Sequence, residues 1–221
     1  MLNCNNLAYN FPTLPADLIK SSLEFKSVSS NGAIKGCVAA IDGFLLKIQT
    51  PAANETGNVK KYYLGHYCRY GINIQAACDY RCRFVSVCVA APGGVNDITA
   101  FRKTGLADLI KELPIGKFVV GDCAYVCSEH LLTPFAGHDK LDAKQSSYNF
   151  YISQMRIRIE MVFGLMTKKW QILCRPMQTK LGNTGKVFMC ITQLHNYCIL
   201  LIFHFKIYKR TIIITINTTP T

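Results

Sequence analysis

Acidic residues are scarce in this sequence. Over 221 residues it has 13 Asp and Glu against 25 Lys and Arg, which gives a formal net charge of +12. This balance favours a polyanionic partner, nucleic acid first and an anionic membrane surface second. It also makes each acid with apolar neighbours informative, because a carboxylate in an apolar setting is costly unless it is paired or holds a cation.

The sequence has no C-x-x-C among its 11 cysteines. Cys78 and Cys82 are separated by three residues, as are Cys123 and Cys127, and no matching pair of histidines accompanies them. These spacings argue against a structural zinc site. Free thiols buried in a reducing compartment are the better interpretation.

No targeting or membrane-spanning segment is visible. The first residues have neither a basic start nor a long apolar run, so no signal peptide is predicted. The stretch 197–221 is apolar and β-branched, but His204, Lys206, Lys209 and Arg210 interrupt it before it reaches the ~18 apolar residues of a membrane helix. We therefore expect no membrane partner, and we interpret the end of this stretch as a strand or as sequence that does not fold.

Hydrophobic residues make up 50% of the chain, which is enough for one domain with a buried core. Apolar periodicity and turn residues give the order of elements. The predicted elements are a partial helix near 14–28, a buried strand at 37–48, a hairpin of strands at 70–78 and 83–91, a helix from Asn96 or Asp97 to about Leu113, a strand at 116–122, a polar linker at 136–146, and helices at 147–169 and 184–202.

This order predicts an α/β fold with one mixed sheet. The first three strands, two of them joined as a hairpin, form an antiparallel part of the sheet. The helix that follows them is long enough for a crossover, so the next strand can join the same sheet in parallel. Helices flank the sheet, and the chain shows no internal repeat.

Two aspartates lie in the apolar strands. Asp42 interrupts the most apolar one, where either it has a partner or the chain turns at the dipeptide Asp42-Gly43. Asp122 ends the strand at 116–122, where either it starts a turn or it binds a ligand beyond the strand end. Each local pattern leaves both readings open.

Two further acids lie at or on helices. Asp97 stands at a helix start, where a capping or first-turn role is the simpler reading. Glu160 lies beside the apolar stripe of the helix at 147–169, and its simpler role is an ion pair with Arg156 four residues earlier. The stripe consists of Ile152, Met155, Ile159, Val162 and Met166.

Taken together, the acids suggest more than they do separately. Two aspartates on strands and a glutamate on a helix can converge on a hard divalent cation such as Mg²⁺, which prefers oxygen ligands. Two such ions about 4 Å apart can activate a water and stabilise the leaving oxygen in phosphodiester cleavage. Basic side chains would then hold the backbone phosphates of a nucleic acid. The basic candidates on the same helix are Arg156, Arg158, Lys168 and Lys169, whose simpler role is a solvated face.

Seven stretches in order resemble the DDE domain of PIF/Harbinger-type transposases. They are "AIDGFLLKIQTP", "YYLGHYCRYGINIQAACD", "RFVSVCVAAPGGVNDITAF", "FVVGDCAY", "LLTPF", "NFYISQMRIRIEMVFGLMTKKWQIL" and "LHNYCI", and they cover about residues 36–198. The resemblance implies an RNase H-like fold and a nuclease that uses Mg²⁺ or Mn²⁺ to cut and join transposon ends.

By motif, the resemblance implies that Asp42, Asp122 and Glu160 are the three catalytic, metal-binding acids. Asp97 matches a further acid at a helix start and is counted with the metal ligands. Two positions depart from the family pattern. The chain has "DGFL" where many members have "DGTH", and Met161 stands where many have Arg, but neither change removes an expected ligand.

The resemblance also implies a domain organisation and partners. Residues 1–35 are expected to be the remnant of an N-terminal helical region, 36–200 the catalytic domain, and 201–221 an atypical tail outside the fold. The expected partners are double-stranded DNA at transposon ends and a Myb-like helper protein, with a homo-oligomer as an alternative to a monomer. The expected location is the nucleus. A catalytically inactive, domesticated or decaying relative that only binds DNA or protein stays open.

Overall fold

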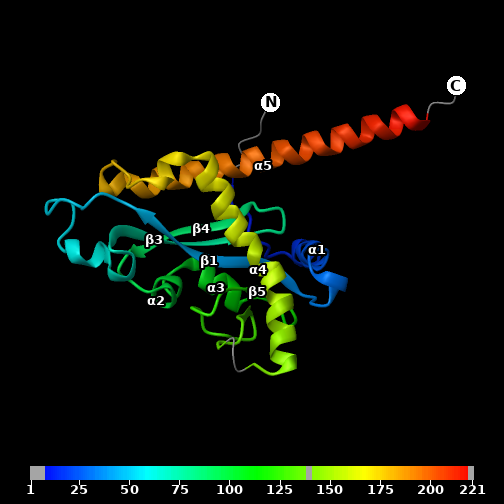
Figure 1. The fold of residues 1–221 in the computed structure, drawn as a ribbon, viewed down its shortest axis with the longest axis horizontal. Helices are drawn as coiled ribbons and strands as arrows, with labels where there is room; N and C mark the ends of the chain where they lie inside the picture. The colour runs from blue at the N-terminus through cyan, green and yellow to red at the C-terminus, as the bar shows by residue number, and fades with distance from the viewer. Residues whose placement is uncertain (1–7, 138–140, 219–221) are drawn as a thin grey trace.

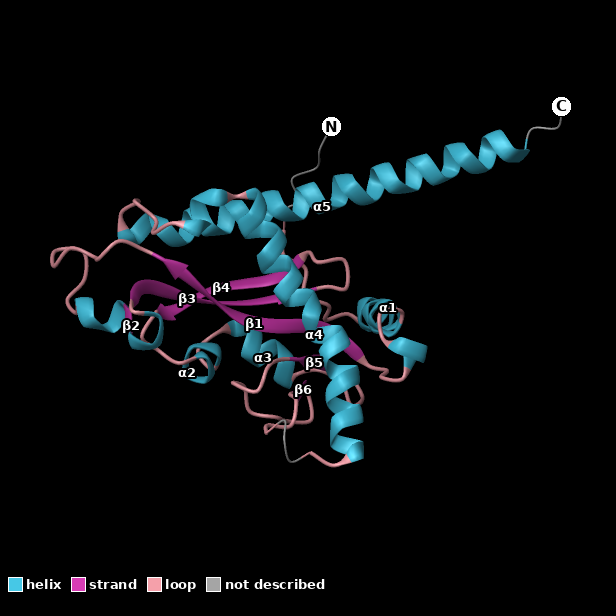
Figure 2. Cartoon of the chain, viewed as in Figure 1, coloured by secondary structure: helices cyan, strands magenta, loops and turns pink. Residues whose placement is uncertain are grey.

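Helices flank both faces of a six-stranded mixed sheet (Figures 1 and 2). The computed structural model describes residues 8–137 and 141–218, with side chains as far as Phe203. Parts of the expected N-terminal remnant at 1–35 and tail at 201–221 therefore lie outside the described residues. The elements are α1 (Pro15–Lys26), β1 (Cys37–Lys47), β2 (Tyr63–Leu64), β3 (Arg69–Cys78), β4 (Phe84–Pro92), α2 (Asp97–Phe101), α3 (Gly105–Lys111), β5 (Phe118–Val120), β6 (Leu131–Leu132), α4 (Ala143–Lys169) and α5 (Leu181–Thr218).

The sheet combines antiparallel and parallel strands as the sequence predicts. Its order is β2-β3-β1-β5-β6, with β4 also paired to β3. β1, β3 and β4 are antiparallel neighbours, whereas β5 joins β1 in parallel and β6 joins β5 in parallel. The predicted hairpin turn is also confirmed, because the Asp79 carboxylate accepts hydrogen bonds from the backbone N–H groups of Arg81 and Arg83, both at 2.9 Å.

Strand β1 is the centre of the sheet and runs without a break through Asp42 and Gly43. Asp42 pairs with Ala76 and Gly43 with Gln75 in the β1–β3 register. The alternative that the chain turns at Asp42-Gly43 is therefore wrong. Asp42 is an acid within a continuous central strand.

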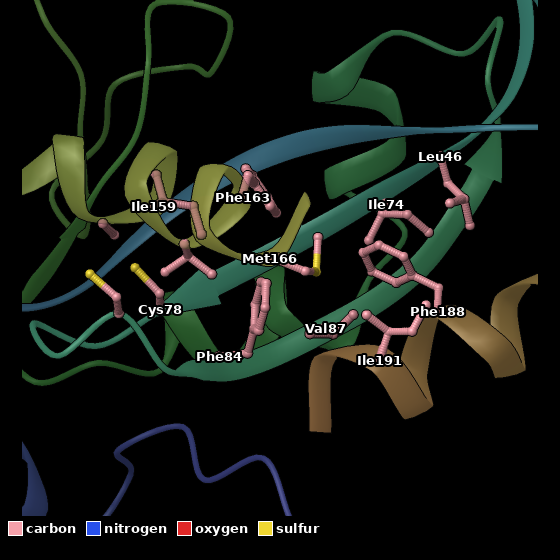
Figure 3. Packing of buried hydrophobic residues seen from close by; sticks show 14 of the residues in the cluster. Leu46, Ile74, Cys78, Phe84, Val87, Ile159, Phe163, Met166, Phe188 and Ile191 are labelled. Carbon is pink, nitrogen blue, oxygen red and sulfur yellow. The ribbon is translucent and has the colours of Figure 1, made fainter. Parts of the chain in front are cut away.

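Two hydrophobic clusters cover the two faces of the sheet. On one face, α4 and α5 pack over β1, β3 and β4, and Figure 3 shows side chains of α4, such as Ile159, and of α5, such as Phe188, in this cluster. On the other face, α1 and α3 pack against a second set of β1 and β5 side chains. Because successive residues of a strand point to opposite faces, a position on β1 decides which helices its side chain meets.

Helix α4 is four residues longer at its start than predicted. Asp142 caps it: its carboxylate accepts from the Gln145 N–H at 2.7 Å, and the Gln145 side chain accepts from the Asp142 N–H at 3.2 Å. This reciprocal capping box starts the helix inside the stretch that was predicted to be linker. The five residues of the predicted stripe are all buried, so the face that packs on the sheet is confirmed.

The predicted helix from 97 to about 113 is wrong in one respect, because it is two helices. α2 ends at Phe101, and α3 begins after Thr104, whose hydroxyl accepts from the Ala107 N–H at 3.3 Å. A threonine that caps a new helix competes with continuation of the old one. The strand predicted at 116–122 is also shorter, since β5 ends at Val120 and leaves Asp122 in the following loop.

Helix α5 replaces the strand that was considered for the C-terminal stretch. The described backbone is helical from Leu181 to Thr218, and the helix extends past the sheet towards the C-terminus (Figure 1). Its part Leu181–Phe203 is the one described helix long and apolar enough to cross a membrane, with a mean hydropathy of 1.4. Within that part, Phe188 and Ile191 are buried in the core of this protein.

Candidate active site

Asp42 lies on β1, and Asp122 lies two residues beyond the end of its parallel neighbour β5. Ala40 of β1 is opposite Val120 of β5, and each aspartate comes two residues later. Alternation along β1 places Asp42 on the same face as Ala40, the face that α4 covers. Local backbone bonds hold both carboxylates: Asp42 accepts from the Gly43 N–H at 2.7 Å, and Asp122 accepts from the Ala124 N–H at 2.9 Å.

The electrostatic state of the two aspartates reflects their closeness. Burial and, to a smaller extent, the charge of Asp122 raise the pKa of Asp42 to about 7. Burial is also the main cause that raises the pKa of Asp122, with Asp97 and Glu160 adding to it. Acids with raised pKa values in one place favour a bound proton or a bound cation.

Helix α4 brings one positive and one negative group to these aspartates. The charge of Arg156 lowers the pKa of both Asp42 and Asp122, although less than burial raises it. Glu160 forms an ion pair with Arg156, and 47% of its side chain is exposed. The simpler reading of Glu160, an ion pair four residues along the helix, is therefore present in the structure.

Asp97 approaches β1 from the opposite face. A Cβ atom at Gly43 would lie 2.4 Å from Asp97 Oδ1, so only glycine leaves room for this carboxylate. The same oxygen accepts from Asn73 Nδ2 at 2.9 Å and from Gln75 Nε2 at 3.0 Å. Asn96, and not Asp97, caps α2 by accepting from the Thr99 N–H at 2.9 Å.

The structure places the predicted acids at different points around β1. The charges of Asp122 and Asp97 raise the pKa of Asp42, and those of Asp97 and Glu160 raise the pKa of Asp122, so the four acids interact electrostatically. Glu160 pairs with Arg156, and Asp97 accepts from Asn73. Over residues 8–137 and 141–203, no three Asp, Glu, His or Cys side chains are placed to hold a metal ion together.

A buried polar network beneath the site was missed by the sequence analysis. Tyr125 is 5% exposed and donates its hydroxyl to Gln75 Oε1 at 2.7 Å. Gln75 in turn donates to Asn73 Oδ1 at 2.8 Å and to Asp97. The signal was available, because Asn73 and Gln75 are two polar residues at a spacing of two in the otherwise apolar run "GINIQAAC".

The motif "LHNYCI" has a structural role at the far end of the hairpin. His195 Nε2 lies 2.9 Å from the Cys82 carbonyl oxygen, and burial lowers the pKa of this histidine. Asn196 pairs twice with the backbone of Phe84, accepting from its N–H and donating to its carbonyl, both at 2.7 Å. These two side chains dock α5 on the β3–β4 turn.

The four basic residues of α4 occupy different surroundings. Lys168 and Lys169 are exposed in the last turn, with the Lys169 ammonium 5.9 Å from the centre of the Trp170 ring. Arg156 forms the ion pair with Glu160. The Nε of Arg158 is buried and has no hydrogen-bond partner among the described residues. Burial raises the pKa of the Cys82 thiol, and the charge of Arg158 offsets part of this rise. A role of these residues in DNA binding stays a prediction.

A central strand and a parallel neighbour that both present aspartates, with a crossing helix above them, define an RNase H-like fold. A sequence model of the DDE superfamily endonuclease family matches residues 41–196, and the chain belongs to this family. The predicted DDE endonuclease family and the fold class are therefore confirmed, and the assignment to PIF/Harbinger-type transposases stays a prediction.

One curated relative shows how much of a longer protein the chain represents. This relative is "Protein ALP1-like" of Arabidopsis thaliana, which is 24% identical to the chain over 173 residues. The matched region covers 72% of this chain and 41% of that protein. The chain thus spans less than half of that relative's length. No solved structure matches the chain.

Proposed function

We propose that this chain is the metal-dependent DNA-cutting domain of a PIF/Harbinger-type transposase. The observation that carries the proposal is the pair of Asp42 on β1 and Asp122 just beyond the parallel strand β5, because the pKa values of both are raised and the charge of Asp122 acts on Asp42. Membership of the DDE superfamily endonuclease family supports DNA as the substrate. Two carboxylates that interact through their charges, beneath a helix with basic residues, are suited to the cleavage of a phosphodiester.

The donor set fits Mg²⁺ or Mn²⁺. Both aspartates supply hard oxygen ligands, and each uses one oxygen to accept a single backbone N–H bond. Glu160 would complete the set from α4 once its bond to Arg156 is exchanged for the cation. Divalent ions here would supply an activated water and charge neutralisation at the leaving oxygen. Asp97 is assigned to the edge of the site, because Oδ1 is already held by two amide donors.

The remaining residues would position the substrate. Once its ion pair with Glu160 is broken, the Arg156 guanidinium can donate two parallel hydrogen bonds to one backbone phosphate. Lys168 and Lys169 are exposed about three turns further along α4 and would hold the DNA backbone as point charges. The Tyr125–Gln75 bond fixes the loop that carries Asp122.

Nicking of supercoiled plasmid in Mn²⁺ or Mg²⁺ tests the proposal. We expect the wild-type protein to convert plasmid to open circles, and Asp42→Asn or Asp122→Asn to lower the rate by about 10²-fold or more. Asp108→Asn is the matched control, because this acid is 68% exposed on α3 and pairs only with Lys111.

Metal binding provides a second readout that does not depend on cleavage. Calorimetric titration with Mn²⁺ should show a site in the wild type and in Asp108→Asn that is lost in Asp122→Asn. Nicking that survives both Asp42→Asn and Asp122→Asn would contradict the assignment of these acids. Nicking by the wild type without any divalent ion would contradict the metal dependence.

A second candidate is a related domain that binds DNA without cutting it. The ion pair between Arg156 and Glu160 favours it, because this bond removes the third acid from the centre. DNA binding at full strength by a protein that binds no Mn²⁺ would support this candidate. In either case the proposed partners are DNA and a Myb-like helper protein, and the proposed location is the nucleus. Light scattering would measure whether the chain forms a homo-oligomer.

A further inference from the structure

A cavity of about 410 Å³ opens beside the acids, on the side of β1 away from α4. Its walls include Gly43 of β1, Asn96 and Asp97 at the start of α2, and Ala124 of the loop after β5. Its size lies within the range of ~300–1,000 Å³ typical of small-molecule and cofactor sites.

The loop after β5 separates this cavity from a second one. Ala124 lines the first cavity, whereas Asp122 and Cys123 line a second cavity of about 420 Å³ that also includes Arg156. The acid Asp122 therefore lies between two cavities of similar size. A DNA strand with its scissile phosphate at Asp122 would have room for a neighbouring nucleotide in either cavity.

Exposed aromatic side chains form the outer wall of the first cavity. His66 and Tyr67 line it, and their rings meet edge to face with centroids 5.0 Å apart. Tyr67 is 59% exposed. An aromatic side chain left this open at the mouth of a cavity offers a flat face on which any nucleobase can stack.

Glycines hold this aromatic segment against the body of the protein. The Gly94 N–H donates to the Lys61 carbonyl at 2.9 Å, and a Cβ atom on Gly94 would lie 2.7 Å from that oxygen. Gly93 likewise approaches the Gly71 carbonyl so closely that a Cβ would lie 2.6 Å from it. Gly93 and Gly94 thus fix the rim of the cavity.

The charges around the cavity favour phosphates outside it and an uncharged base inside it. Lys60, Lys61 and Arg69 are exposed on the same segment as the aromatics, where they can hold a DNA backbone. Inside the cavity, the negative charge of Asp97 repels a phosphate. Asn96 uses its side-chain oxygen to cap α2, which leaves its amide nitrogen as a donor to a polar base edge.

We propose that this cavity binds an unpaired nucleobase of the DNA strand next to the scissile phosphate, stacked on Tyr67. The inference rests on the proposed function for the identity of the strand. A base within a duplex is stacked on its neighbours and must leave the stack to enter such a cavity. The site therefore recognises frayed or single-stranded ends and is tolerant of sequence.

The test measures DNA binding in EDTA, so that no cleavage occurs. The probes are a blunt duplex and the same duplex with a short single-stranded overhang that carries 2-aminopurine. We expect tighter binding of the overhang DNA and quenching of the 2-aminopurine fluorescence. Tyr67→Ala should weaken binding of the overhang DNA by about 5- to 150-fold and remove the quenching, with the affinity for blunt duplex unchanged. Tyr67→Phe should retain both effects.

Phe150→Ala is the matched control, because this aromatic side chain is 56% exposed on α4 and does not line the cavity. It should bind both probes like the wild type. Equal affinity of the wild type and Tyr67→Ala for the overhang DNA would overturn the inference, and so would equal weakening for both probes. If the wild type nicks plasmid but shows no preference for the overhang, the inference fails while the proposed function stands. If nicking is absent but the Tyr67 effects are seen, the base site stands without the cleavage.

Discussion

Asp42→Asn is expected to stabilise the metal-free protein above neutral pH. Folding raises the pKa of Asp42 from its ordinary value of 3.8 to about 7, chiefly through burial. Between these two values the folded protein binds a proton that the unfolded chain has already lost, so stability falls as the pH rises through this window and is lowest above it. Asn resembles the protonated acid and can still accept the Gly43 N–H bond.

The size of the effect follows from the pKa rise. At 1.36 kcal/mol for each pKa unit the full rise corresponds to about 4 kcal/mol, and partial solvation of the side chain reduces this to about 2–4 kcal/mol. Urea unfolding in EDTA at pH 8 and at pH 4.5 measures it. The gain of Asp42→Asn should be largest at pH 8 and small at pH 4.5, while Asp108→Asn should change stability by less than about 0.5 kcal/mol at both. A loss of stability in Asp42→Asn at pH 8, or a pH-independent difference, would refute the reasoning.

Three further substitutions test the surroundings of the site by urea unfolding. Gly43→Ala should cost about 1–3 kcal/mol and weaken Mn²⁺ binding, because the methyl group would displace Asp97; unchanged stability would show that this carboxylate moves freely. Tyr125→Phe should cost about 1–3 kcal/mol, since it leaves the buried Gln75 oxygen unpaired, and a neutral effect would place that oxygen in contact with water. Asn196→Ala should cost about 2–5 kcal/mol, because a buried N–H and carbonyl of β4 both lose their partner; a cost below 1 kcal/mol would contradict this role.

The pairing of Asp42 with Asp122 followed from simple patterns in the sequence. Both aspartates stand in or just after apolar runs that had to be buried strands, and the crossover between the runs allowed a parallel pair. The seven motifs added Glu160, which no local pattern distinguished from a surface ion pair. Its ion pair with Arg156 was the simpler prediction from their spacing of four residues, and the structure contains this pair.

Other features depended on contacts between distant residues. The face on which Asp97 meets β1 is set by hydrogen bonds from Asn73 and Gln75. The spacing of two between these polar residues indicates that they share a face of β3, but it does not identify Asp97 as their partner. The break between α2 and α3 was missed because the capping role of Thr104 was not recognised. β6 is two residues long, which is too short for any periodic signal. The early start of α4 was readable in its capping residues and was overlooked among polar neighbours.

Anomalous diffraction from crystals soaked in Mn²⁺ tests the central claim most directly, because it locates the metal without relying on activity. The account predicts a peak in contact with both Asp42 and Asp122, with the Glu160 carboxylate released from Arg156 and turned towards it. Crystals of Asp122→Asn should lack this peak. A Mn²⁺ peak at other residues only, or none between the two aspartates at saturating Mn²⁺, would contradict the account.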